Sequence, residues 1–239
     1  LKSSYVDIFT VETKSYYEKL KKTSVFKNRI EYLPNGVSLL DIDLTELDIL
    51  PKENIVVTVG RLGTYEKNNS LLLKAIKNLP IELVKNWEFL LIGPSTQEFS
   101  KEVALFKEKN PAIANCINMT GEINNRNTLY SYLRRAKIIC MTSLSESTCI
   151  STLEGMYFGT YPVITNYSDF TLETTNNNKV GCIVENKNIN ALVSSLKHIM
   201  SDDNLYCKGI ESQSYVRSVF DYGVLTKSLD SILRRYIKG

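Results

Sequence analysis

Histidine is almost absent from this chain of 239 residues, in which His198 stands alone. Cysteine is sparse and scattered, without any C-x-x-C pair, at Cys116, Cys140, Cys149, Cys182 and Cys207. An odd number of distant cysteines beside one histidine argues against a disulfide framework and against a structural zinc site. The chain also has no large excess of charge of one sign, since it contains 29 Lys and Arg and 26 Asp and Glu, and its basic residues form no dense block. A phosphate-neutralising surface for nucleic acid is therefore not expected.

Long apolar runs are missing as well. No stretch reaches the length that crosses a bilayer, and no signal-peptide pattern opens the chain. Reduced cysteines on apolar segments favour a cytoplasmic location. The chain begins with Leu1, in what reads as the middle of a structural unit, so we expect a fragment of a longer protein.

What the chain does have is a regular alternation of apolar runs and amphipathic helices. The apolar runs are short, most of them end at or beside glycine or a polar turn, and they predict strands over 54–60, 87–93, 116–121, 137–142, 161–165 and 181–185. Helical patterns separate most of these runs, and two or three amphipathic helices are expected between Ile189 and Lys238. Such alternation predicts an α/β fold, a Rossmann-like open parallel sheet with helices on both faces. Ligands of such sheets bind beyond the carboxyl ends of the strands.

The loop "GRLGTYEKNNS" follows the first of these strands. Gly60 ends the strand, Arg61 follows at once, and Lys67 precedes the next helix. A planar guanidinium and a point charge near a helix start form a suitable seat for a diphosphate. The loop is not a P-loop, since G-x-x-x-x-G-K-[ST] is absent. The alternative is that both cations are solvated loop charges.

The stretch "SESTCISTLEG" follows the fourth of these strands and holds Glu146 and Glu154, with seven residues between them. We expect a helix to begin between Thr148 and Ile150, where free backbone amides suit phosphate oxygens. Carboxylates bind vicinal hydroxyls instead, so Glu154 would face a ribose and Glu146 a sugar. The alternative is a surface glutamate plus a carboxylate that stabilises the helix dipole.

Together, these segments resemble the donor-binding domain of retaining GT-B glycosyltransferases, the GT4 or "glycosyl transferases group 1" family. The resemblance covers about residues 54–200 and rests mainly on E-x7-E after G-R-x5-K, followed by "GTYPVIT". The chain departs from the family's glycine-rich patterns at Ser147 to Cys149 and in "NYSDF" after the fifth strand.

The resemblance implies a nucleotide-diphospho-sugar donor, a UDP-, GDP- or ADP-sugar, whose sugar is transferred with retention. Arg61 and Lys67 would hold the diphosphate and stabilise the leaving group, and Glu146 would lie by the transferred sugar. Other implied donor-binding residues are Gly60, Glu122, Ile123, Thr148, Cys149, Ile150 and Glu154, with Glu122 and Ile123 at the nucleobase. No metal or other cofactor is expected, since the cations balance the leaving-group charge.

The resemblance also implies a domain organisation. Residues 1–36 would end an N-terminal acceptor domain, 37–53 would connect the domains, 54–220 would bind the nucleotide-sugar, and 221–239 would form a helix that crosses back. The acceptor would be a glycan or a lipid-linked glycan, with peripheral membrane association possible through the missing part. The fragment alone would bind donor but transfer poorly.

Two other functions stay open at this point: a UDP-sugar epimerase or phosphorylase-type enzyme of the same architecture, and a non-catalytic nucleotide-sugar-binding domain. Cys149 is either a small residue near the phosphate or a thiol whose pKa the helix start lowers. The leading interpretation requires Arg61, Lys67, Glu146 and Glu154 to converge on one cleft.

Overall fold

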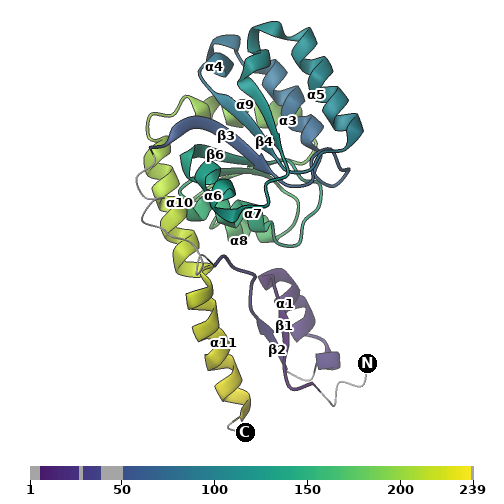
Figure 1. The fold of residues 1–239 in the computed structure, drawn as a ribbon. Helices are drawn as coiled ribbons and strands as arrows, with labels where there is room; N and C mark the ends of the chain where they lie inside the picture. The colour runs from purple at the N-terminus through teal and green to yellow at the C-terminus, as the bar shows by residue number, and fades with distance from the viewer. Residues whose placement is uncertain (1–5, 27–28, 39–50, 238–239) are drawn as a thin grey trace.

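The structure is a computed structural model that describes residues 6–26, 29–38 and 51–237. Figure 1 shows a large α/β unit, a small unit at the amino-terminal end, and a long helix that leaves the large unit and runs toward the level of the small one. Most of the predicted connector, residues 39–50, lies outside the described residues.

The large unit is built on a six-stranded sheet with the order β5-β4-β3-β6-β7-β8. Every neighbouring pair is parallel. The strands are β3 (Glu53–Val59), β4 (Glu88–Ile92), β5 (Ile117–Gly121), β6 (Ala136–Met141), β7 (Tyr161–Thr165) and β8 (Cys182–Val184). All six predicted strands are thus confirmed, with no end shifted by more than one residue, and so is the fold class.

Helices cover both faces of this sheet. On one face lie α3 (Asn69–Asn78), α5 (Gln97–Lys109) and α9 (Ile189–Met200), and on the other lie α6 (Arg126–Arg135), α7 (Ile150–Tyr157) and α10 (Leu205–Val219). Their apolar side chains form one core cluster on each face with the buried residues of the strands. Strands buried on both faces explain the continuous apolar runs of the sequence.

The small unit contains two parallel strands, β1 (Phe9–Val11) and β2 (Ile30–Tyr32), with α1 (Lys14–Lys21) and the short η2 (Ser24–Phe26) between them. The helical spacing in "VETKSYYEKLK" and the short apolar run in "RIEYLPNGV" predict a helix and a strand here, and α1 and β2 confirm both, but β1 was missed. Three residues give too little periodicity to predict a strand. The unit contacts α8 (Phe170–Thr174), where the Tyr32 hydroxyl donates to Glu173 Oε2 over 2.6 Å.

The remaining elements are short or terminal. Sequence reasoning missed α4 (Ile81–Lys85), η3 (Pro111–Cys116) and α8, which have five or six residues each. The tail is confirmed as three helices, α9, α10 and α11 (Tyr222–Ile237). Backbone hydrogen bonds from Val37 to Phe220 (2.8 Å) and from Tyr222 to Val37 (3.0 Å) join the start of α11 to the segment that follows β2.

Glycines end three neighbouring strands because the backbone turns sharply there. Gly93 has φ +131°, and a Cβ on it would lie 2.0 Å from the carbonyl oxygen of Gly60. Gly121 has φ +73°, but a Cβ there would have nothing within 4 Å. Gly93 therefore combines backbone strain with a close approach between two loops, whereas Gly121 carries the strain alone.

We expect Gly93→Ala to lower the free energy of unfolding by roughly 3 kcal/mol or more, because strain and overpacking add. Gly121→Ala is the matched control and should cost about 1 kcal/mol from strain alone. Guanidinium denaturation followed by the fluorescence of Trp87, the only tryptophan, measures both. Equal losses in the two variants would contradict the close approach.

Candidate functional site

Two loops meet at the carboxyl edge of the sheet, because the central strands β3 and β6 are paired. The loop after β3 carries Lys67, and the loop after β6 carries Glu146. The amide of Leu144 donates to the Glu66 carbonyl over 2.7 Å, and the buried Thr142 hydroxyl donates to the Asn68 carbonyl over 3.0 Å. These bonds fix one loop against the other.

Lys67 and Glu146 form an ion pair between these loops. Each side chain is only 15% exposed, and the Ser143 hydroxyl also donates to Glu146 Oε1 over 2.7 Å. Gly60 leaves room for the lysine, since a Cβ there would lie 3.3 Å from Lys67 Cε. The structure therefore brings together two predicted site residues that are far apart in the sequence.

Arg61 is placed differently. Its side chain is 70% exposed, and its guanidinium pairs with Glu66 Oε1 over 2.7 Å, within the same loop. The convergence of four side chains on one cleft, which the sequence analysis required, is thus only partly observed: Lys67 and Glu146 touch, whereas Arg61 lies at the loop surface and Glu154 pairs with Arg126 of α6. Whether Arg61 holds a diphosphate stays a prediction.

Helix α7 begins at Ile150, as predicted, with Cys149 as the residue that precedes it. Thr148, at the same end, accepts a hydrogen bond from the Asn35 side-chain amide over 3.0 Å. Burial raises the pKa of the Cys149 thiol, and the negative charge of Glu146 raises it further. The alternative of a thiol activated by the helix start is therefore wrong, and Cys149 is a small buried residue.

Glu154 lies one turn into α7 and is buried, with 8% of its side chain exposed. Its Oε1 pairs with Arg126 and accepts a hydrogen bond from the Tyr130 hydroxyl over 3.2 Å. Arg126 Nη1 also donates to the Tyr130 hydroxyl over 3.0 Å. Burial and the nearby Glu154 carboxylate raise the pKa of Tyr130 to about 12, so this hydroxyl remains a donor at neutral pH.

The amphipathic run "NTLYSYLRRA" predicts Tyr130 only as a residue that packs its helix against the sheet, and nothing in the sequence analysis pointed to Arg126. Tyr130 does belong to the core, but its hydroxyl also reaches Glu154. The spacing of four residues within one helix could have paired the arginine with the tyrosine. Nothing in the sequence indicates that both meet Glu154, which lies on the next helix along the chain.

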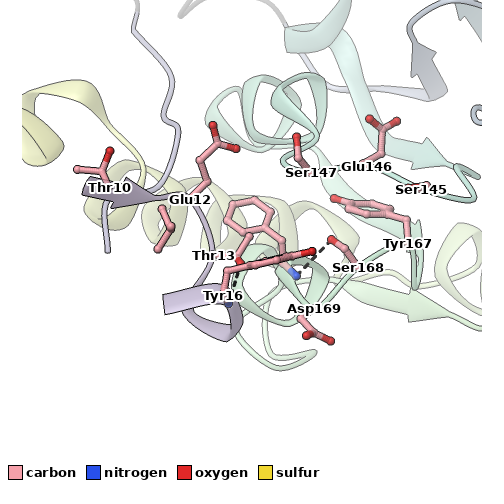
Figure 2. Close-up of a pocket in the computed structure, with 12 residues that line it drawn as sticks. Thr10, Glu12, Thr13, Tyr16, Ser145, Glu146, Ser147, Tyr167, Ser168 and Asp169 are labelled. Atoms are coloured by element: carbon pink, nitrogen blue, oxygen red, sulfur yellow. Dashed lines mark hydrogen bonds between the residues drawn. The ribbon is translucent and has the colours of Figure 1, made fainter. Parts of the chain in front are cut away.

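Two cavities flank the start of α7. The first has a volume of about 660 Å³ and lies between the small unit and the loops after β6 and β7. Figure 2 shows Glu12 and Thr13 of the small unit on one side of it, and Ser147, Tyr167 and Ser168 on the other. Glu146 lines this cavity. Its lining is rich in hydroxyl and carboxylate groups.

The second cavity has a volume of about 520 Å³. Its lining comes from α6, α7, the start of α11 and residues 35–38, and includes Arg126, Tyr130, Ile150 and Glu154. Since Ser147 lines the first cavity and Ile150 the second, the start of α7 separates the two. Each glutamate of the E-x7-E motif thus borders a different cavity.

Residues 42–213 match the protein family described as "Glycosyl transferases group 1", which is well over half of the chain. The chain belongs to this family. A curated relative from Campylobacter jejuni subsp. jejuni serotype O:2 is 27% identical over 191 residues, which are 80% of this group 1 chain and 49% of the relative. Its name is GalNAc-alpha-(1->4)-GalNAc-alpha-(1->3)-diNAcBac-PP-undecaprenol alpha-1,4-N-acetyl-D-galactosaminyltransferase. The group 1 chain thus spans about half the length of this relative.

Solved structures share the fold at low sequence identity. Sucrose-phosphate synthase from Thermosynechococcus elongatus is 20% identical with a TM-score of 0.76, over 96% of this chain and 58% of its own. Anabaena HepE, solved in complex with UDP and glucose, is 14% identical with a TM-score of 0.74, over 96% of this chain and 63% of its own. A Rickettsia africae glycosyltransferase is 18% identical with a TM-score of 0.73, over 98% of this chain and 64% of its own. These matches confirm that the group 1 chain has the GT-B type of α/β domain.

Other predicted site residues of the group 1 domain lie away from the two cavities. Glu122 is exposed and Ile123 half-buried after β5, and neither lines the first or the second cavity. Their contact with a nucleobase stays a prediction. Within 6–26, 29–38 and 51–237, no three His, Cys, Asp or Glu side chains gather as metal ligands. In the same ranges no helix is both long and apolar enough to cross a membrane.

We expect Lys67→Met to lower the free energy of unfolding by about 1–2 kcal/mol, because Glu146 is then left half-buried without its cation. Lys67→Met combined with Glu146→Gln should recover most of this loss. Arg61→Ala, which breaks an exposed pair, is the control and should change stability by less than about 0.5 kcal/mol. Denaturant unfolding that gives the double variant the summed loss of both single variants would contradict the coupling.

Thiol labelling should follow burial. Cys207 is exposed, whereas Cys140 and Cys149 are buried, and burial raises the pKa of the Cys140 thiol to about 12. At pH 8 we expect Ellman's reagent to react with Cys207 first and with Cys140 and Cys149 only after unfolding, because the thiolate is the reactive form. Cys207→Ser should remove the fast phase. A Cys149 that reacts as fast as Cys207 would contradict the buried position.

Proposed function

We propose that this chain is the donor-binding part of a glycosyltransferase that uses a nucleotide-diphospho-sugar. The observation that carries the proposal is the pair of cavities on either side of the α7 start, each bordered by one glutamate of the E-x7-E motif. A nucleotide-sugar has the matching layout, with hydroxylated groups at both ends and a diphosphate between them. Pairs of neighbouring hydroxyls on the ribose and the sugar would donate hydrogen bonds to the two carboxylates. The diphosphate between them would accept hydrogen bonds from backbone amides at the helix start.

The nucleoside end fits the second cavity. Glu154 would accept hydrogen bonds from the ribose hydroxyls there, and Ile150 and Tyr130 offer apolar surface beside it. A nucleoside diphosphate in this position would have its phosphates at the start of α7. Glu122 and Ile123 would then contact the base only if the loop after β5 extends over the ligand.

The diphosphate would bind the amides of Thr148, Cys149 and Ile150, at a helix start where N–H groups lack intrahelical partners. Lys67 is close to this point through its contact with Glu146, and Arg61 would turn from the loop surface toward the phosphates. Both cations would stabilise the negative charge that develops on the leaving diphosphate when the bond to the sugar breaks. This arrangement would make a metal ion unnecessary.

The sugar end fits the first cavity, beside Glu146 and the hydroxyls of Ser145, Ser147 and Ser168. We infer a hexose as the transferred group, moved to a hydroxyl of the acceptor with retention at the anomeric carbon, as the E-x7-E pattern of the retaining GT4 enzymes suggests. Glu146 would orient the sugar while its Lys67 partner faces the phosphate. The small unit on the opposite wall would approach the acceptor.

The complete enzyme would need more than the residues seen here. The name of the Campylobacter jejuni relative describes transfer to an undecaprenol-linked glycan, which supports a glycan or lipid-linked glycan as acceptor. We infer action in the cytoplasm, with peripheral membrane contact through the remainder of the N-terminal domain. The 239-residue chain alone is expected to bind donor and to transfer poorly.

Calorimetry with UDP-, GDP- and ADP-sugars should detect binding of at least one donor to the folded chain. Arg61→Ala and Glu154→Ala should each weaken that binding at least about tenfold, since each removes a charge-assisted contact. Lys85→Ala, which removes an exposed cation far from both cavities, is the control. Folded chain that binds no nucleotide would contradict the proposal. Epimerised free nucleotide-sugar, or no transfer at all by the complete protein, would favour one of the two alternative functions.

A further inference from the structure

The two oxygens of the Glu154 carboxylate are in different environments. Oε1 receives both the Arg126 guanidinium and the Tyr130 hydroxyl, and Arg126 also donates to that hydroxyl, which closes a triangle of hydrogen bonds. No other described residue donates to Glu154, so Oε2 has no protein partner in the described part of the chain. Glu154 also lines the second cavity. One oxygen is thus held by the protein, and the other is left for a ligand.

The partners of Oε1 suit a positioning role. Tyr130 is 2% exposed and is fixed by the core of the α6 face, where its ring lies 4.9 Å from that of Phe158. Arg126 sits one turn earlier on α6, with its guanidinium 5.8 Å from the centre of the Tyr130 ring. A rigid donor and a cation on one oxygen restrict rotation of the carboxylate about its last bond. The positive charge also offsets the cost of burying Glu154.

We propose that Arg126 and Tyr130 are positioning residues that hold Glu154 Oε1, so that Oε2 faces the ribose hydroxyls of the donor. This inference rests on the proposed function and deepens it, because it names the residues that make the site select ribose. Both residues border the second cavity, but their proposed effect does not require contact with the ligand. Their effect is on the hydrogen bond between Glu154 and the sugar of the nucleoside.

The inference is tested by comparing nucleotides with and without ribose hydroxyls. The probes are UDP, GDP and ADP and their 2′,3′-dideoxy counterparts, titrated into the 239-residue chain by calorimetry. The readout, for whichever base binds, is the dissociation constant of the dideoxy form divided by that of the ribose form. We expect Arg126→Gln and Tyr130→Phe each to reduce this ratio about fivefold, mainly by weakening the binding of the ribose form.

A double-mutant cycle separates positioning from direct contact. In a Glu154→Gln background the ratio should already be low, and adding Arg126→Gln should lower it by less than about twofold, because its effect passes through Glu154. The matched control is Arg135→Gln, which breaks another ion pair of α6, with Glu53 at 2.6 Å, far from the cavity. This control should leave the ratio unchanged. Thermal unfolding of each variant confirms that the fold is intact.

The outcomes are distinct. An unchanged ratio in Arg126→Gln and Tyr130→Phe would overturn the inference while nucleotide binding still supports the proposed function. Equal weakening of ribose and dideoxy forms would also overturn it, since Arg126 would then contact the base or phosphate itself. Tighter binding of both forms by Arg126→Gln would overturn it too, because the Arg126 side chain would then block the cavity. If no nucleotide binds to the folded chain, the proposed function is contradicted, and this inference with it.

Discussion

The structure of the site depends on the parallel pairing of β3 with β6 at the centre of the sheet. Because the carboxyl ends of parallel strands meet at one edge, this pairing brings Lys67 against Glu146 across 79 positions of sequence. The buried Thr142 hydroxyl and the Leu144 amide then bind carbonyls of the neighbouring loop. The charged pair therefore rests on a rigid backbone, which spares it much of the entropy cost of ordering two long side chains.

Helix α7 divides the site because of how closely it approaches the sheet. Gly155 makes this possible, since a Cβ there would lie 2.8 Å from Ile139 Cδ1 of β6. Glu146 precedes the helix and Glu154 lies within it, so the two carboxylates border separate cavities. The two glutamates flank a helix start, where backbone amides lack intrahelical partners and suit an anion. Because Glu146 and Glu154 lie on either side of the α7 start, neither carboxylate takes the position that an anion would have there.

The amino-terminal segment completes both cavities. Residues 10–13 line the first, and residues 35–38 line the second beside the start of α11. Gly36 lies at this crossing, where a Cβ would be 2.4 Å from the carbonyl oxygen of Phe220. The hydrogen bonds between Val37, Phe220 and Tyr222 therefore hold a wall of the second cavity in place. The large unit alone would leave both cavities more open.

The amino-acid sequence by itself determined the alternation of strands and helices, the parallel sheet, the family and the two glutamates, because periodicity and motif spacing are local properties of the chain. Only the tertiary structure decided what each charged group touches. Arg61 pairs with Glu66 at the surface, Lys67 with Glu146, and Glu154 with Arg126 of the preceding helix. Such pairs depend on loop paths and on the packing of one helix against another. These follow from long-range contacts, which no local pattern in the sequence encodes.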